Sequence, residues 1–349
     1  MREDRNYALD VIRSTALLLV VLLHSAGHFY IDQSGRFVVN PDSFAIVSFA
    51  SLGRAGVPLF VIISGYLLLP IHISTREFFL RRFRRILLPF LFWSIIYAVY
   101  ESYVWGGGGV TQFIKYVFHI PINFVTAHLW YVYMLIGLYC LAPIISPWIE
   151  KVGKKQMLFF LLLWLLCSLS VIIHLQFQNI LGEVEWNHYS SIYYFQGFIG
   201  YFVFGAYLKK YGMISFHLSL GAFLMGLFIT ILLIHIGIHL SLEERFFNTF
   251  WDYCSFNIAL MSLGLFGIIY HWSYYIRFGD KSLVVDFSRR SYAIYLAHII
   301  VLRLTSGYVL QTIDSALLAI PLIIIVVMVL TYLLCRLMSK LPYADKWLG

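Results

Sequence analysis

Charged side chains are scarce in this sequence. Asp, Glu, Lys and Arg make up 12% of the 349 residues, whereas hydrophobic residues make up 61% and the mean hydropathy is +0.81. Soluble globular domains carry about 25% charged residues. One water-soluble core of this size cannot hide so much apolar surface, and no polar stretch is long enough for a soluble domain. The composition therefore predicts an all-α polytopic membrane protein, with residues 1–349 forming one transmembrane domain.

Cysteine is also rare. The four cysteines, Cys140, Cys167, Cys254 and Cys335, fall inside apolar runs, and no two have the CxxC spacing of a metal or redox site. We therefore expect neither a disulfide framework nor a bound metal ion. The sequence also has no convincing internal repeat, which counts mildly against transporters that are built from repeats. A cleavable signal peptide is not expected, because the first apolar run is long and contains Arg13.

Apolar runs long enough to cross a bilayer recur along the whole chain. About 20 apolar residues span the hydrocarbon core as a helix. By this measure we expect ten transmembrane helices, with both termini in the cytoplasm. They are Leu9–Tyr30, Phe44–Pro70, Ile86–Trp105, Leu129–Trp148, Met157–Gln176, Ser191–Leu208, Ile214–His239, Trp251–Tyr275, Ser291–Leu310 and Ala316–Met338.

The distribution of basic residues supports this orientation. Of the 25 Lys and Arg residues, 19 fall in the segments placed in the cytoplasm, three (Arg36, Lys115 and Arg245) in outer segments, and three within or at the rim of spans. This is the positive-inside pattern, and it favours an even number of spans. The net charge of +8 thus reflects the orientation of the chain in the membrane, and no nucleic-acid partner is expected. We expect a multi-pass protein of the inner (cytoplasmic) membrane, in contact with membrane lipids.

The first predicted helix carries the most informative polar set, Asp10, Arg13, His24 and His28. At 100° per residue, Arg13 and His24 lie about 20° apart around the helix and about 16 Å apart along it, and the other two fall within about 60° of Arg13. Such a face must point into the bundle, because ionisable groups in lipid are costly. Two interpretations stay open: Asp10 and Arg13 simply pair while His24 bonds to a neighbouring helix, or the face is a functional site.

Six segments, in this order along the chain, resemble the motifs of acyltransferase family 3, whose membrane-bound members O-acylate cell-surface carbohydrates. They are Leu9–Arg13 followed after ten residues by His24, Val57–Tyr66 (VPLFVIISGY), the basic run Arg81–Arg85 with Pro89, His128–Tyr131 (HLWY), Phe202–Leu208 (FVFGAYL) and Ser291–His298 (SYAIYLAH). Each segment alone is weak, but the set covers nearly the whole chain. The layout is similar to that of short members that lack an esterase-like C-terminal domain.

The resemblance implies acyl-CoA, most simply acetyl-CoA, as a cytoplasmic donor, and an extracytoplasmic or lipid-linked glycan as the acceptor. His24 would then be the general base, or in a rival mechanism would carry the acyl group, with Arg13 and Asp10 beside it in the catalytic set. The implied donor contacts are arginine–phosphate pairs, and the implied acceptor contacts are imidazole and indole rings. The donor residues are Arg81, Arg82, Arg84 and Arg85, and the acceptor residues are His28, His128, Trp130 and His298.

Several plainer interpretations remain beside these. The arginine cluster also fits a topology signal or lipid headgroup contacts. Ser64 is expected to allow close helix packing and not to act as a nucleophile. Glu101 and Asp252 could orient a histidine or bind sugar hydroxyls, but the preferred interpretation is that they are solvated charges at the edges of loops. For the whole chain, the alternative function is a transporter or flippase for polysaccharide or a small solute, which buried charges on ten helices would also suit.

Overall fold

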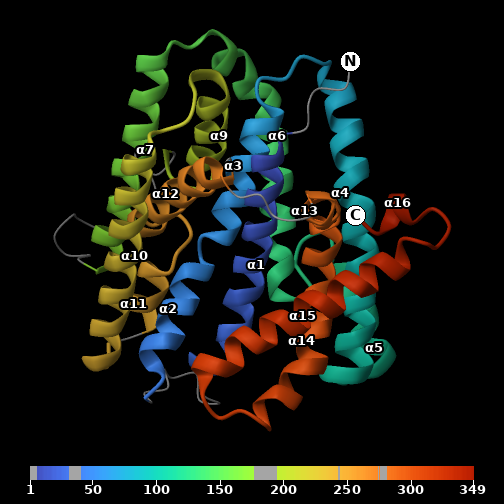
Figure 1. Cartoon of the computed structure of the whole chain (residues 1–349). Coiled ribbons are helices and arrows are strands. Elements are labelled where there is room, and N and C mark those ends of the chain that lie inside the picture. Colours follow the sequence, from blue (N-terminus) through green and yellow to red (C-terminus); the bar gives the residue numbers. More distant parts are fainter. Residues whose placement is uncertain (1–5, 31–40, 177–194, 243, 274, 276–280) are drawn as a thin grey trace.

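The computed structural model describes the chain except for residues 1–5, 31–40, 177–194, 243, 274 and 276–280. Every regular element in the described part is helical, as predicted (Figure 1). Eight helices there are long and apolar enough to cross a membrane. They are α1 (Tyr7–Tyr30), the pair α2 and α3 (Ser43–Gly53 and Gly56–Leu68), α4 with the π-helical turn η1 (Thr75–Tyr100 and Glu101–Trp105), the 3₁₀ turn η2 with α6 (Ala127–Leu129 and Trp130–Lys151), α10 (Phe216–His239), α12 (Phe256–Ser273), α14 (Ser291–Leu310) and α15 (Ala316–Met338).

Two further helices correspond to the fifth and sixth predicted spans. α7 (Lys154–Gln176) has 23 residues and is long enough to cross. α9 (Ile199–Tyr211) has only 13 residues, about 20 Å at 1.5 Å per residue, and the start predicted for it at Ser191 lies outside the described residues. Residues 200–208 of α9 are all buried. α9 is therefore a core helix in its described part, too short to cross a core of about 30 Å by itself.

The predicted span Phe44–Pro70 corresponds to one candidate crossing, Ser43–Leu68, but its helix is interrupted by a turn at Arg54–Ala55 between α2 and α3. Pro58 has no N–H to donate to the carbonyl of Arg54, and its ring crowds that carbonyl. The glycines on either side of the turn let it press against α1. A Cβ on Gly53 would lie 2.8 Å from Leu23 Cβ, and one on Gly56 would lie 2.8 Å from the Ala16 carbonyl oxygen.

The basic segment Ile71–Arg85, which lies between two predicted spans, is helical from Thr75 onward. Ser74 caps this helix, because its hydroxyl accepts a hydrogen bond from the Glu77 N–H at 3.3 Å. The arginines that follow therefore project from fixed faces of α4. Four short helices complete the description: α5 (Gly109–His119), α11 (Glu244–Phe250), α13 (Lys281–Arg289) and α16 (Ala344–Trp347).

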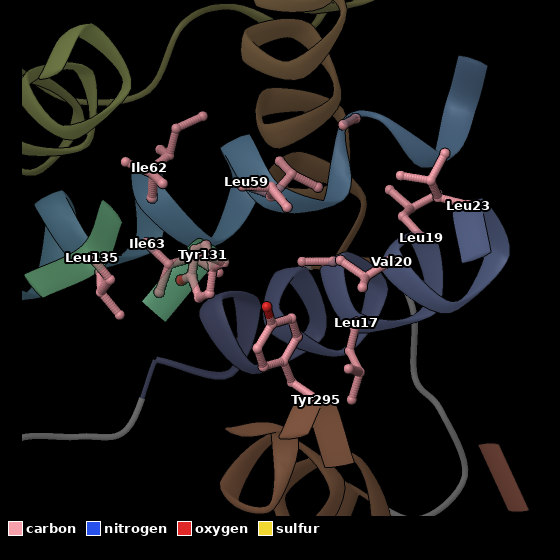
Figure 2. Close-up of a cluster of buried hydrophobic side chains, with 14 of the residues drawn as sticks. Leu17, Leu19, Val20, Leu23, Leu59, Ile62, Ile63, Tyr131, Leu135 and Tyr295 are labelled. Atoms are coloured by element: carbon pink, nitrogen blue, oxygen red, sulfur yellow. The ribbon is translucent and has the colours of Figure 1, made fainter. Parts of the chain in front are cut away.

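α1 lies in the middle of the bundle and packs against α2, α3 and α12 to α15 (Figure 1). Its Leu17 and Val20 face a buried apolar cluster that includes Leu59 of α3, Tyr131 of α6 and Tyr295 of α14 (Figure 2). Most side chains of α1 thus meet protein, although Leu18 is exposed.

α3 and α9 cross at two glycines. A Cβ on Gly65 would lie 1.9 Å from the Phe202 carbonyl oxygen, and one on Gly205 would lie 2.1 Å from the Ile62 carbonyl oxygen. Small residues allow helix backbones in membranes to approach in this way. This agrees with the packing role expected for the Ser64–Gly65 pair, and the Ser64 hydroxyl donates to its own helix, to the Phe60 carbonyl at 2.9 Å.

We expect Gly65→Ala to destabilise the protein by roughly 1–3 kcal/mol or more, because the added methyl group forces two backbones apart. The matched control is Gly137→Ala in α6, where a Cβ would have no atom within 4 Å. Thermal unfolding in detergent should show a lower midpoint for Gly65→Ala and an unchanged or higher midpoint for the control. Equal midpoints for Gly65→Ala and the parent would contradict the tight crossing.

Candidate active site

Three histidines that are far apart in the sequence meet inside the bundle. The ring centroid of His24 on α1 lies 5.3 Å from that of His298 on α14 and 6.4 Å from that of His128 in η2, and the last two are 5.3 Å apart. His128 and His298 are buried, whereas His24 is partly exposed. The structure thus brings together three of the predicted site residues, and this group is called the histidine cluster below.

Hydrogen bonds orient two of these rings. His298 Nδ1 lies 2.6 Å from the Tyr295 carbonyl oxygen, which can only accept, so Nδ1 carries the hydrogen and donates it. His128 Nδ1 lies 3.2 Å from the Thr126 hydroxyl. Nε2 of both rings is buried and has no hydrogen-bond partner among the residues that the structure describes. Because buried polar atoms are normally paired, two unpaired imidazole nitrogens in one cluster indicate a site that holds a polar group or a proton in transit.

Tyrosines fix the backbone around the cluster. The Tyr97 hydroxyl on α4 donates to the Leu296 carbonyl at 2.8 Å, and the Tyr97 ring lies 5.0 Å from His128. The Tyr295 hydroxyl donates to the His128 carbonyl. Helices α4 and α14 and the turn η2 are therefore held to one another where the histidines meet.

Two other predicted acceptor residues do not join the cluster. His28 is exposed, one turn beyond His24 on α1. The ring centroid of Trp130 lies 5.3 Å from that of Tyr253 and 5.7 Å from that of Phe198, in an aromatic group beside the cluster. Only Leu129 stands between His128 and Trp130 in the sequence, so the aromatic group and the cluster are neighbours.

A cavity of about 160 Å³ opens at the end of the bundle where α4 begins and α6 ends. Four arginines line it: Arg13, Arg82, Arg85 and Arg289. Of the predicted donor residues, the structure thus places Arg82 and Arg85 at the cavity. Arg81 is exposed and pairs with Glu77, and Arg84 is exposed, and neither lines the cavity. Around the axis of α4, the mean direction of residues 82 and 85 lies about 100° from that of residues 81 and 84, which is consistent with this split.

Asp10 and Arg13 both contact Ser288 of α13. The Ser288 hydroxyl donates to Asp10 Oδ1 at 2.6 Å, and Arg13 donates to the same hydroxyl at 3.3 Å. Asp10 is buried. The Ser288 hydroxyl thus links Asp10 to Arg13 and helps to hold Arg13 at the cavity wall.

One layer of aromatic side chains separates the cavity from the histidine cluster. Tyr131 and Tyr295 line the cavity, are buried, and have ring centroids 5.3 Å apart (Figure 2). Tyr295 also contacts the histidine cluster: its ring centroid lies 5.7 Å from that of His128 and 5.8 Å from that of His298. His24 does not line the cavity. This pair of rings is called the tyrosine layer below.

The expectation that Glu101 is a solvated charge was wrong, because its side chain is buried and pairs with Arg303 of α14. Glu101 lies in the π-helical turn η1, which rotates the direction of its side chain relative to a regular α-helix. The sequence pattern does not reveal this rotation. Asp252 is exposed, as expected.

Sequence reasoning missed the positions of Ser288, Tyr131 and Tyr295 at the site. Tyr295 lies three residues before His298 on one helix face, so this spacing could have indicated it.

The comparisons with known proteins give one result. The family model described as an acyltransferase domain, that of acyltransferase family 3, matches residues 6–337. No curated protein and no solved structure matches the chain. The matched region contains the histidine cluster and the four arginines that line the cavity, together with every helix through most of α15. The chain belongs to acyltransferase family 3, and it is a multi-pass membrane acyltransferase.

Proposed function

We propose that this acyltransferase moves an acyl group, acetyl in the simplest case, from cytoplasmic acyl-CoA to a hydroxyl of an extracytoplasmic or lipid-linked carbohydrate, and that it works in the inner (cytoplasmic) membrane. The observation that carries the proposal is the arrangement of two sites along one axis. An arginine-lined cavity opens at the end with most basic residues, and the histidine cluster lies beyond a single tyrosine layer.

The cavity suits the donor by charge. Coenzyme A carries phosphates at its nucleotide end, and arginine pairs with phosphate through a planar fork of donors. Arg82 and Arg85 on α4 would hold these phosphates, with Arg289 opposite. The thioester would then extend past Arg13 toward the tyrosine layer. The nucleotide is too polar to cross the membrane, so donor and acceptor must meet inside the bundle.

The histidine cluster supplies the base that the transfer needs. In the direct mechanism His24 takes the proton of the acceptor hydroxyl while the oxygen attacks the thioester carbonyl. The C–S bond breaks, and the imidazolium returns its proton to the leaving thiolate. In the rival mechanism a His24 nitrogen first takes the acyl group, releases the thiol and passes the acyl group to the hydroxyl. Both mechanisms use the same ring, and His298, whose free Nε2 belongs to the same cluster, would orient it or share its proton.

The direct test is donor use by the purified protein in proteoliposomes. We expect acetyl-CoA to be bound and its thiol to be released when a membrane glycan fraction is supplied, with the acetyl label recovered on carbohydrate. Acetyl-pantetheine, which lacks the nucleotide, should be used poorly. A protein that neither binds nor consumes any acyl-CoA would refute the proposal and favour solute or polysaccharide transport.

A further inference from the structure

Arg54 lies at the break between α2 and α3, beside the turn of α1 that leads to His24. The contact of Gly53 with Leu23 fixes this position. The guanidinium carbon of Arg54 lies 5.2 Å from the ring centroid of Trp251 and 5.4 Å from that of Tyr253. Two aromatic faces thus hold the cation in place.

A second arginine of the bundle has the same surroundings with one difference. The Arg303 guanidinium lies 5.0 Å from the Trp105 ring centroid and 5.8 Å from that of Tyr100, and it also pairs with the Glu101 carboxylate. The three ion pairs seen among the described residues, Arg303–Glu101, Arg81–Glu77 and Arg290–Asp286, do not include Arg54.

The Arg54 Nε is buried, and in the described part of the chain it has no hydrogen-bond partner. The nearby Asp252 is exposed and accepts a hydrogen bond from the Cys254 N–H at 2.7 Å. A buried donor on a charged group is costly to leave unpaired. The Arg54 guanidinium hydrogen-bonds the Tyr253 hydroxyl and interacts with the charge of Asp252, but unlike Arg303 it has no carboxylate at ion-pair distance among the described residues. An anion from outside would supply that missing partner.

The aromatic rings extend from Arg54 toward the histidine cluster. Tyr253 lies 5.3 Å from Trp130, which is two residues from His128, and Trp251 lies 5.1 Å from Tyr30 at the end of α1. The Trp251 indole N–H donates to the Ser51 hydroxyl at 3.0 Å, which fixes that ring to α2. Flat aromatic faces around a forked cation are suited to a sugar ring that bears a carboxylate or a phosphate.

We infer that Arg54, with Trp251, Tyr253 and Trp130, forms an acceptor subsite that selects a glycan carrying an anionic group near the hydroxyl that is acylated. This inference rests on the proposed function for the identity of the acceptor as a carbohydrate. The anion is the carboxylate of an acidic sugar or the phosphate of a sugar phosphate, and the same fork on Arg54 would bind either.

The test measures binding without any acyl donor, so that it does not depend on catalysis. The probes are methyl glucoside, methyl glucuronide and the 6-phosphate of methyl glucoside, which share one ring and differ only at carbon 6. Titrations of the parent protein in detergent, followed by tryptophan fluorescence, should show that at least one anionic probe binds about tenfold or more tightly than the neutral probe. Tighter binding of the phosphate identifies a sugar phosphate, and tighter binding of the glucuronide identifies an acidic sugar.

Arg54→Met should abolish this preference and leave the affinity for the neutral probe within about twofold, because the methionine side chain still fills the space between the rings. Arg54→Lys keeps the charge without the fork and should retain only part of the preference. Arg303→Lys, a change at the arginine already paired with Glu101, should retain all of it. If Arg54→Met does not fold, as judged by its melting temperature, Arg54→Lys alone decides the question.

The inference is overturned if the parent binds all three probes equally, or if the preference survives unchanged in both Arg54 variants. The assay also separates this inference from the proposed function. Loss of the preference in Arg54→Met by a protein that consumes no acyl-CoA would refute the proposed reaction and keep the anion subsite. Acyl transfer by a protein that binds all three probes equally would refute the anion subsite and keep the proposed reaction.

Discussion

Replacing His24 with alanine is expected to lower acyl transfer by roughly 10²–10⁴-fold, the loss typical when a general base is removed. His24 lies about 22 Å along α1 from Leu9, past the middle of a hydrocarbon core of about 30 Å. Its ring contacts those of His128 and His298, beyond the tyrosine layer from the cavity. Because the cavity arginines are untouched, coenzyme A affinity should not change. Acyl transfer to glycan and coenzyme A affinity are measured on the same preparation.

His28→Ala is the matched control, because His28 lies on the same helix but is exposed and outside the cluster. Its loss of activity should be clearly smaller than that of His24→Ala. Transfer at the parent rate by His24→Ala would remove this residue from the chemistry. Trapping of an acylated protein that is lost in His24→Ala would favour the acyl-imidazole mechanism over direct transfer.

The second large effect concerns donor affinity. Neutralising Arg82 and Arg85 together should weaken coenzyme A binding, with each lost phosphate contact costing roughly 1.5–3 kcal/mol. Both side chains line the cavity, from one face of α4. Calorimetry on correctly inserted protein measures the change, and acetyl-pantetheine, without the nucleotide phosphates, should bind parent and variant alike.

Neutralising Arg81 and Arg84 together is the matched control. It removes the same number of positive charges from the same turns of α4, so it weakens the positive-inside signal equally. These two side chains do not line the cavity, and Arg81 pairs with Glu77. We therefore expect the control to keep the parent affinity. Equal losses in both double variants would assign the cluster to topology or to lipid headgroups and not to the donor.

Much of this architecture was predictable because local rules decide it. Apolar length alone identified the long helices, and 3.6 residues per turn placed Arg13 and His24 on one face of α1. In the structure Arg13 indeed lies at the cavity and His24 lies in the cluster, both directed into the bundle. The roles of these residues in catalysis stay predictions until the variants are measured.

Other features depend on contacts between distant segments, which a pattern within one segment does not contain. Pro58 signalled a possible break, but a proline within a long apolar run is also compatible with a kinked continuous helix. The burial of Glu101 requires Arg303 from another helix, about 200 residues away. The separation of Arg82 and Arg85 from their neighbours became visible only once Ser74 was seen to start the helix. The contacts of Arg54 with the Trp251 and Tyr253 rings, about 200 residues away in the sequence, could not be predicted from the segment around Arg54.

The tyrosine layer bears on the electrical integrity of the membrane. An open polar path from the arginine-lined cavity to the histidines would let protons and small ions leak and would discharge any gradient that the membrane maintains. Tyr131 and Tyr295 close that path with two buried rings, and the Tyr295 hydroxyl is already engaged by the His128 carbonyl. In the proposed reaction, the thioester arm of the donor would have to pass these two rings, whose centroids lie 5.3 Å apart. The layer would then admit the donor arm and still keep hydrated ions out.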